Sequence, residues 1–399
     1  MAKIIAHIDL NAFFAAAECL RNPSLKGKPL IIGGKGRAGI VSTCSYEARK
    51  YGIHSGMPTF QALKLCPNVI IVPVDYKYYQ MLSTSFFYHV KEYTSLIEMA
   101  SIDECYADFT KPLENVKDMV SYFSSMQNRL YREMGLSASI GVSSNKWLAK
   151  MGSDLKKPMG LTFLFPKDIE KVLYPLPIES FWGIGKKTSP RLRGIGIHTI
   201  GDLARAVNED DPRVKSLLGK FLFTVKEWVN GGGSDELQLE RIDPKSIGAS
   251  TTLPYDMSTF AEIKPSLEEV SLEVSERAKK AKKAGTTVTL TVKDTVGTFH
   301  LHTRNKVLDR ASNDFNTIFE AAKELYMKEF DGNMEIRLVG VSINKLIDPR
   351  KEPIQMSIFD TEETLPEDKT HDLIDEINSK LRKPLLKRAS EAENRKKGK

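Results

Sequence analysis

Helical and strand-like patterns alternate along residues 75–165, and this alternation limits the folds that the chain can adopt. YYQMLSTSFFYHVKEYT, VKDMVSYFSSMQNRLYREMG and NKWLAKMGSDLKK carry apolar residues at helical spacing. Among them, IEMASIDECYADF predicts a hairpin and SASIGVSS predicts a strand. Strands interleaved with helices favour an α+β sandwich in which helices cover one face of a sheet. KIIAHIDL predicts a further strand, which leads into a helix with Asn11 as its N-cap.

The length of 399 residues is enough for roughly two to four domains. Short helical patterns at 169–232 are followed by an extended polar linker at 233–244, and a second strand-and-helix unit occupies 245–348. The elements expected in this unit are a helix at 260–284, the strands TTVTLTVKD and FHLHTRN, a helix near 307–330 and the strand MEIRLVGVSINKL. From about 349 the chain is polar and then basic, which is typical of a mostly disordered tail.

Net charge says little about the partners of this chain. The total is +7, but residues 382–399 hold eight basic and two acidic residues, a net of +6 (8 − 2). The rest therefore carries about +1 (7 − 6), and any basic surface must come from local clustering. The four cysteines form no CxxC pair, which favours free thiols in a reducing compartment. Because no run approaches the length of a membrane span, we expect a cytoplasmic protein.

A glycine-rich segment, GKGRAG at residues 34–39, matches the dinucleotide-binding pattern GxGxxG. That motif requires a helix directly after its glycines, whereas the β-branched IVST follows here. The segment is therefore predicted to form a hairpin turn between two strands.

Two adjacent carboxylates, Asp103 and Glu104, stand in the otherwise strand-like ASIDECYADF. A buried charge without a partner is costly, so this pair either faces water or holds a cation. Neighbouring strand residues point to opposite faces, so joint binding requires a hairpin tip or a bulge. Together with Asp9, three carboxylates at one sheet edge can hold two Mg²⁺ ions for phosphoryl transfer. The residues alone equally allow Asp9 as a helix cap and the pair as a solvated turn.

Five motifs in order carry a resemblance: IDLNAFFAAAE, STCSYEARKYGIHSGMP, ASIDECYAD, IGVSSNKWLAKMGSDLKKPMG and FWGIGKKTSPRLRGIGI. They closely resemble the Y-family translesion DNA polymerases, most of all the bacterial DinB type (DNA polymerase IV). The resemblance covers roughly residues 1–348. It implies an α+β multidomain, right-hand polymerase with these parts: a palm at 1–12 and 75–168, small fingers at 13–74, a helical thumb at 169–232, a linker at 233–244, an α+β little finger at 245–348 and a flexible tail at 349–399.

The resemblance also implies the catalytic residues. Asp9, Asp103 and Glu104 correspond to the ligands of two Mg²⁺ ions, with the Leu10 backbone carbonyl as a further ligand. Family members often carry an aromatic residue or Met where Leu10 stands, which matters little for a backbone ligand. Mn²⁺ also suits such an oxygen-rich site.

Further residues are assigned to the incoming dNTP by the same resemblance. Phe14 corresponds to the steric gate, a ring that would collide with a ribose 2′-OH; by itself it could equally be a core aromatic. Tyr46 and Arg49 share one helical face, and a guanidinium suits phosphate oxygens. The full set implied for nucleotide binding is Phe13, Thr43, Tyr46, Arg49 and Lys157. The 34–39 hairpin resembles the roof over the templating base.

Contacts to primer-template DNA are implied in the thumb and the little finger. WGIGKKTSPRLRGIGI resembles a helix-hairpin-helix element, whose glycine turns expose N–H groups to a DNA phosphate without reading sequence. The glycines are Gly183, Gly185, Gly194 and Gly196. In the little finger, Arg304 and the lysines at 279, 280, 282 and 283 are candidate backbone contacts, although a solvated helix end explains the lysines as well.

In the tail, Gln355, Ile358 and Phe359 of QMSIF resemble the pentapeptide that docks bacterial polymerases on the sliding clamp. A short apolar patch is the alternative. We therefore expect a monomeric, template-directed, Mg²⁺-dependent, low-fidelity DNA polymerase for translesion synthesis without a proofreading exonuclease. The rival interpretations are a non-catalytic DNA-binding relative and a nucleotidyl cyclase with a similar two-metal core.

Overall fold

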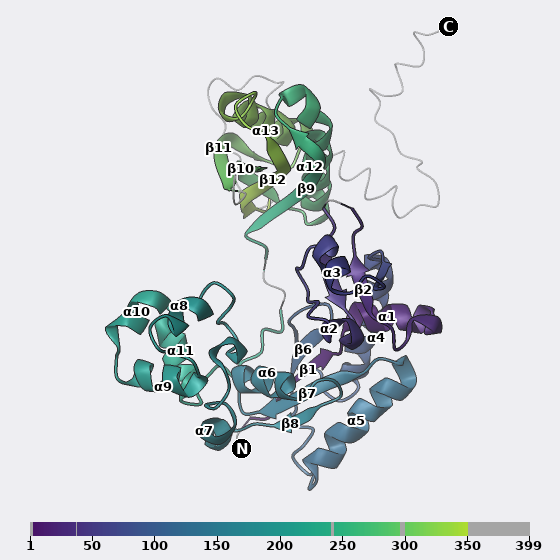
Figure 1. The fold of residues 1–399 in the computed structure, drawn as a ribbon, viewed down its shortest axis with the longest axis vertical. Helices are drawn as coiled ribbons and strands as arrows, with labels where there is room; N and C mark the ends of the chain where they lie inside the picture. The colour runs from purple at the N-terminus through teal and green to yellow at the C-terminus, as the bar shows by residue number, and fades with distance from the viewer. Residues whose placement is uncertain (1–2, 37, 241–242, 296–299, 350–399) are drawn as a thin grey trace. The chain divides into compact units, whose positions relative to one another are not determined.

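The computed structural model describes residues 3–36, 38–240, 243–295 and 300–349. The chain divides into two compact units, Met1–Pro244 and Lys245–Lys399, and each is described by itself (Figure 1). The four cysteines are free, and three of them are buried, as expected.

The centre of the first unit is a five-stranded sheet in the order β5-β6-β1-β7-β8. β1 pairs antiparallel with β6 and β7, and β8 runs parallel to β7. All six residues of β1 are buried, so the sheet is built around it. The strands are β1 (Ile5–Leu10), β5 (Ile97–Met99), β6 (Glu104–Asp108), β7 (Ala138–Ser143) and β8 (Leu161–Phe163).

Helices pack on both faces of this sheet, so the prediction of a single covered face was incomplete. α4 (Tyr76–Lys91) and α5 (Met119–Met134) pack on Ala6, Ile8 and Leu10, the even-numbered residues of β1. On the other face, α6 (Lys146–Leu155) brings Ala149 against Ile5 and Tyr106 (Figure 1). The alternation of a strand therefore turns His7 and Asp9 towards α6.

A glycine on β7 permits this second contact. A Cβ atom on Gly141 would overlap the Ala149 carbonyl oxygen and the Ser153 amide nitrogen of α6. The backbones of strand and helix thus touch directly, which only glycine allows.

We therefore expect Gly141→Ala to destabilise the protein by about 1–3 kcal/mol, because α6 must move away from the sheet. The free energy of unfolding, measured by urea denaturation, tests this. Gly34→Ala is the control, because the nearest atom to its added Cβ is Gly39 Cα at an ordinary 3.4 Å. Equal stability of the two variants would contradict the expectation.

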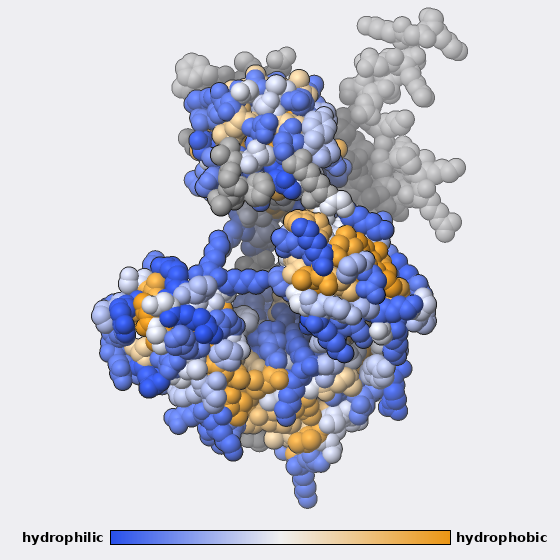
Figure 2. All heavy atoms as spheres, in the orientation of Figure 1, coloured by the Kyte–Doolittle hydropathy of each residue, from blue (hydrophilic) through white to orange (hydrophobic). Residues whose placement is uncertain are grey.

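The fingers hold a three-stranded sheet in the order β3-β2-β4, with the predicted hairpin at 34–39 between β2 and β3. α3 leaves Phe60, Leu63 and Leu65 exposed, and Figure 2 shows apolar residues gathered over this part of the surface. The elements are α1 (Phe13–Arg21), η1 (Pro23–Leu25), β2 (Leu30–Gly33), β3 (Val41–Cys44), α2 (Tyr46–Arg49), α3 (Thr59–Leu65) and β4 (Ile70–Val72).

The prediction that Asn11 caps the first helix was wrong. α1 begins at Phe13, and its N-cap is Ala12 in the left-handed region at φ 45°. The Asn11 side chain is used elsewhere: its amide donates to Ser139 Oγ (2.9 Å), and its oxygen accepts from the Met159 N–H (2.9 Å). These two bonds tie the end of β1 to β7 and to the loop after α6.

The thumb is helical and shares α6 with the palm. Trp147 of α6 stacks on Trp228 at 5.6 Å between ring centroids, inside a core that also holds Phe181 and Val225. The thumb elements are η2 (Pro166–Asp168), α7 (Ile169–Val172), η3 (Ile178–Ser180), α8 (Ser189–Arg193), α9 (Ile200–Asn208), α10 (Pro212–Leu218) and α11 (Phe221–Val229).

The second unit is a four-stranded antiparallel sheet, β11-β10-β12-β9, with two helices packed on its apolar face. The predicted helix near 307–330 begins later than expected, because β11 continues to Ser312. The elements are β9 (Ser246–Met257), α12 (Phe260–Lys280), β10 (Ala284–Asp294), β11 (Leu301–Ser312), α13 (Phe315–Glu329) and β12 (Ile336–Ile347).

Candidate active site

The adjacent carboxylates lie at the tip of a hairpin, which confirms one of the two arrangements that the sequence allowed. β5 and β6 form the hairpin, and the Ala100 and Ser101 N–H groups donate to the Glu104 carbonyl at its tip. Glu104 begins β6 and stands directly opposite Asp9 of β1. The fold thus places two carboxylates side by side on the face that α6 covers.

Asp103 belongs to the turn just before β6. Its carbonyl accepts the Leu10 N–H at 3.0 Å, and its carboxylate accepts a 2.6 Å hydrogen bond from Ser101 Oγ. Burial raises the pKa of Asp103, the Asp9 and Glu104 charges raise it further, and the Ser101 hydrogen bond opposes them. Among the described residues, Asp103 is not part of the close group of possible ligands that His7, Asp9 and Glu104 form, and its carboxylate is bonded to Ser101.

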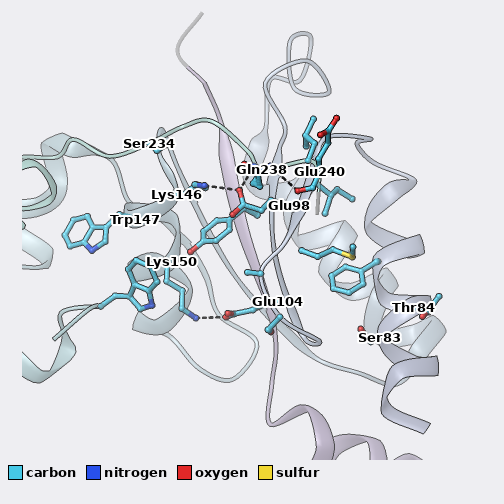
Figure 3. A pocket seen from close by; sticks show the side chains of 18 of the residues that line it. Ser83, Thr84, Glu98, Glu104, Lys146, Trp147, Lys150, Ser234, Gln238 and Glu240 are labelled. Atoms are coloured by element: carbon cyan, nitrogen blue, oxygen red, sulfur yellow. Dashed lines mark hydrogen bonds and ion pairs between the residues drawn. The ribbon is translucent and has the colours of Figure 1, made fainter. Parts of the chain in front are cut away.

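Two lysines compensate this negative charge. Lys150 Nζ lies 3.2 Å from Asp9 Oδ2 and 2.8 Å from Glu104 Oε2, the latter drawn in Figure 3. Lys157 Nζ lies 2.8 Å from Asp9 Oδ2 and 2.8 Å from Asp154 Oδ1. Burial opposes the charge of both lysines, but these carboxylates raise their pKa values, so both stay protonated.

His7 completes the site, and sequence reasoning missed it. Its ring is fully buried, with Nδ1 2.8 Å from Ser153 Oγ and Nε2 3.3 Å from Glu104 Oε2. The second distance is a polar contact outside good hydrogen-bond angles. Burial lowers the pKa of His7. The pKa of the Glu104 carboxyl is also lowered, mainly by the contact with His7 and further by Lys150. Among the described residues, His7, Asp9 and Glu104 form the group whose possible ligand atoms all lie within 4.8 Å.

These donors fit a hard divalent cation. The carboxylates of Asp9, Asp103 and Glu104 and the Leu10 carbonyl are all oxygen donors, which Mg²⁺ prefers. The pKa of Asp103 is raised mainly by burial and also by the negative charges of Asp9 and Glu104. A bound cation would offset the repulsion among these charges. In the structure the Lys150 and Lys157 amines supply compensating charge, and a bound cation can supply the same.

Two of the residues predicted to bind the nucleotide lie near Asp9: Lys157 forms an ion pair with it, and Tyr46 interacts with both. Tyr46 and Arg49 share one face of α2, with the guanidinium 4.6 Å from the Tyr46 ring centre. Burial raises the pKa of Tyr46, while Arg49 and Lys157 lower it, so the phenol lies near both cations. Its buried hydroxyl has no well-aligned hydrogen-bond partner in the described part of the chain. Thr43 is half-buried on the neighbouring strand β3.

The two phenylalanines at the start of α1 differ in exposure. Phe14 is partly buried and stacks on Tyr79, whereas the Phe13 ring lies in the palm core. Only 2% of the whole Phe13 residue is exposed, so its predicted contact with a nucleotide stays a prediction.

A cleft of about 1110 Å³ opens beside Glu104 and Lys150, between palm and thumb (Figure 3). Trp182, Trp228 and Met99 line it, together with residues 238–240 of the segment that leaves the thumb. Glu98 holds that segment to the palm, since it accepts from Lys146 Nζ (2.9 Å) and from the Gln238 N–H (2.8 Å). The predicted linker thus has fixed contacts as far as residue 240.

The thumb glycines differ in backbone conformation and in the hydrogen bonds that their N–H groups make. Gly183 and Gly196 adopt left-handed φ angles of 105° and 90°, which a side chain would disfavour. In the second turn the Gly194 and Gly196 N–H groups already donate to the Pro190 and Arg193 carbonyls. A phosphate contact through those two amides would have to replace these bonds. Within the described ranges, the Gly183 and Gly185 N–H groups donate to no backbone carbonyl.

In the second unit, Arg304 lies on the helix-covered side of β11. Its Nε donates to Glu329 at 3.0 Å, and its guanidinium lies 5.5 Å from the Phe330 ring centre. Lys279 and Lys280 end α12 in exposed positions, and Lys282 follows in a left-handed conformation. Gln355, Ile358 and Phe359 lie outside the described residues.

Comparison with known proteins shows which family this chain belongs to. The impB/mucB/samB family matches residues 8–154, the IMS family HHH motif matches 166–197, and the impB/mucB/samB family C-terminal domain matches 244–358. A solved Y-family DNA polymerase chimera built on Dbh aligns with a TM-score of 0.74 at 27% identity, covering 86% of this chain and 99% of that chain. The DNA polymerase IV of Bacillus velezensis is 36% identical over 97% of this chain and 93% of its own length. The chain belongs to the Y family of DNA polymerases.

Other Y-family relatives agree. The DNA polymerase IV of Listeria monocytogenes is 39% identical over 86% of this chain and 96% of its own length. A Dbh ternary complex aligns with a TM-score of 0.58 at 27% identity, covering 86% of this chain and 98% of that chain. The Y-family assignment and the right-hand α+β fold class are therefore confirmed, and the chain is a DNA nucleotidyltransferase of translesion synthesis. No helix in the described ranges is long and apolar enough to cross a membrane.

We predict that Lys150→Ala makes the stability of this polymerase more dependent on Mg²⁺. Without the amine, Asp9 and Glu104 face each other as like charges, so the metal-free protein loses stability that a bound cation restores. The measurement is the thermal midpoint with EDTA and with excess Mg²⁺. Lys146→Ala is the matched control one turn earlier, because that amine binds Glu98 instead. Equal Mg²⁺-induced increments in wild type and Lys150→Ala would refute the compensating role.

Proposed function

We propose that the chain is a template-directed, Mg²⁺-dependent, low-fidelity DNA polymerase that transfers a nucleotide from dNTP to a primer 3′-OH. The observation that carries this is the pairing of Asp9 with Glu104 across two strands, with Asp103 in the adjacent turn. Family membership supports the reaction class, and the oxygen-only donor set supports the metal.

Asp9, Asp103, Glu104 and the Leu10 carbonyl would hold two Mg²⁺ ions, and Mn²⁺ can replace them. When bound, the two ions lower the energy of the attacking 3′-oxygen and of the leaving pyrophosphate. The chain itself fixes the carboxylates through the β1–β6 register and the buried contacts of His7 and Lys150.

Arg49, Tyr46 and Lys157 would bind the triphosphate, with Thr43 and Phe13 beside them. Lys157 is bound to Asp9 in the structure and could exchange this partner for a phosphate oxygen, because both are anionic oxygens. The Tyr46 hydroxyl, buried without an aligned partner, is available to donate to the same group. Phe14 would exclude ribonucleotides by collision with the 2′-OH.

Primer-template DNA would lie against the glycine turns of the thumb and against the little finger. The domain boundaries that we propose are those predicted from the sequence. The resemblance to a polymerase that was solved as a ternary complex supports DNA as the substrate. We also propose synthesis without proofreading, as the resemblance to the Y family implies. We also propose a monomeric, cytoplasmic enzyme.

Replacement of a metal ligand is the direct test. We predict that Glu104→Ala lowers primer extension by at least about 10²-fold, because the metal site and its compensating network lose a charge. Primer-template affinity should stay within a few-fold of wild type. Glu114→Ala, an exposed palm carboxylate, serves as the control and should extend normally. Near-normal extension by Glu104→Ala would eliminate the two-metal assignment, and inactive wild type that still binds DNA would favour the non-catalytic alternative.

The clamp motif is a separate proposal. Ile358 and Phe359 would fill an apolar pocket of the sliding clamp while the Gln355 amide bonds at its rim. Replacement of Ile358 and Phe359 by Ala should remove clamp-stimulated synthesis and leave extension on a bare primer intact. Leu365→Ala changes an apolar residue outside the pentapeptide and should keep the stimulation. Full clamp stimulation after the double replacement would reject the motif.

A further inference from the structure

The Phe14 ring rests on a second aromatic residue that sequence reasoning did not single out. Phe14 of α1 and Tyr79 of α4 stack with ring centres 4.3 Å apart and planes inclined by 13°. Tyr79 is fully buried, and Phe13 packs edge-on against it at 6.2 Å. The face of Phe14 that lies on Tyr79 therefore has a rigid support.

The Tyr79 hydroxyl is held by a buried carboxylate. It donates to Glu18 Oε1 at 2.8 Å, and Glu18, one turn after Phe14 on α1, is only 4% exposed. The nearest cation to Glu18 is Arg21, at 3.9 Å, and Arg21 is itself bound to Asp75 at 2.8 Å. Asp75 caps α4 through the Tyr78 N–H. The Tyr79–Glu18 hydrogen bond and the Arg21–Asp75 ion pair thus hold α1 against the start of α4 beside the stacked rings.

This arrangement is more than ordinary core packing. Burial of a carboxylate is unfavourable, and an apolar side chain at position 18 would fill the same space without that cost. What the carboxylate adds is direction, since a hydrogen bond to a buried acceptor fixes the angle at which the phenol ring lies. Burial and then the Glu18 hydrogen bond raise the pKa of Tyr79, so the phenol remains a donor.

We propose that Tyr79 and Glu18 are positioning residues that set the depth and tilt of Phe14 and thereby the discrimination between dNTP and rNTP. The inference rests on the proposed gate function of Phe14 and deepens it. A steric gate works through a collision over a short distance, so small freedom of the ring admits the 2′-OH. Neither Tyr79 nor Glu18 has to touch the nucleotide for this effect.

The variants separate the hydrogen bond from the packing. Tyr79→Phe keeps the stacked ring and removes the hydroxyl, and Glu18→Ala removes the acceptor. Glu18→Gln keeps an acceptor oxygen of the same size and should restore the wild-type ratio. Tyr78→Phe is the matched control, because its hydroxyl bonds the Ala17 carbonyl of α1 at 3.3 Å but its ring does not stack on Phe14. Phe14→Ala reports on the gate itself.

The readout is the ratio of kcat/KM for dNTP to that for the matching rNTP in single-nucleotide insertion on undamaged primer-template. The fraction of active enzyme cancels in this ratio, so a loss of stability alone does not alter it. We expect Tyr79→Phe and Glu18→Ala to lower the ratio roughly tenfold, and Phe14→Ala to lower it further. Glu18→Gln and Tyr78→Phe should stay within about twofold of wild type.

Each outcome decides a separate question. The positioning role would be overturned if Tyr79→Phe and Glu18→Ala kept the wild-type ratio while Phe14→Ala lowered it. The gate assignment would then still stand. An unchanged ratio in Phe14→Ala would overturn the gate assignment and this inference with it, while extension that depends on Glu104 would still stand. A ratio that falls equally in Tyr78→Phe would also overturn the inference, since it would indicate general loosening between α1 and α4.

Discussion

The ion pairs of Lys150 with Asp9 and Glu104 are the interaction on which the first unit depends. The β1–β6 register places these two carboxylates directly opposite each other, an arrangement that is destabilising for like charges. One buried amine on α6 offsets that repulsion at both carboxylates. The helix can bring it there because Gly141 lets α6 lie on the strand backbone. The same helix anchors the thumb through Trp147, so palm, thumb and charge balance share one element.

Strand register and local motifs made part of this site predictable. Asp9 could be placed at the end of the first strand and Glu104 at a hairpin tip, because alternation and turn geometry are local properties. Tyr46 and Arg49 could be placed on one helical face for the same reason. The spacing of Lys150, Asp154 and Lys157 also indicates one face of a helix, and His7 stands two residues before Asp9. Those signals were present, but spacing alone does not say which sheet the helix face covers.

Other features depend on contacts between distant segments. Asn11 has the character of a helix cap, yet bonds to Ser139 and Met159, more than a hundred residues away, satisfy its amide instead. Arg304 stays a predicted DNA contact, and its hydrogen bond to Glu329 of α13 could not be predicted, because it joins a strand to a helix 25 residues further along the chain. The end of β11 at Ser312 was likewise misjudged, because pairing with β10 outweighs the local helical pattern.

The short connection between β1 and α1 joins the carboxylate Asp9 to Phe14, the residue proposed as the sugar gate. Asp9 is the last residue but one of a strand that is buried at every position, and Phe14 follows Asp9 by five residues. Ala12 in between has φ of 45°, a conformation that costs an alanine roughly 1–2 kcal/mol. The two hydrogen bonds of Asn11 hold the chain in that turn. The position of the Phe14 backbone relative to the carboxylates is thus set by this turn, and the depth and tilt of its ring are left to Tyr79 and Glu18. On the proposed gate role of Phe14, a ring fixed in this way would exclude a single hydroxyl group.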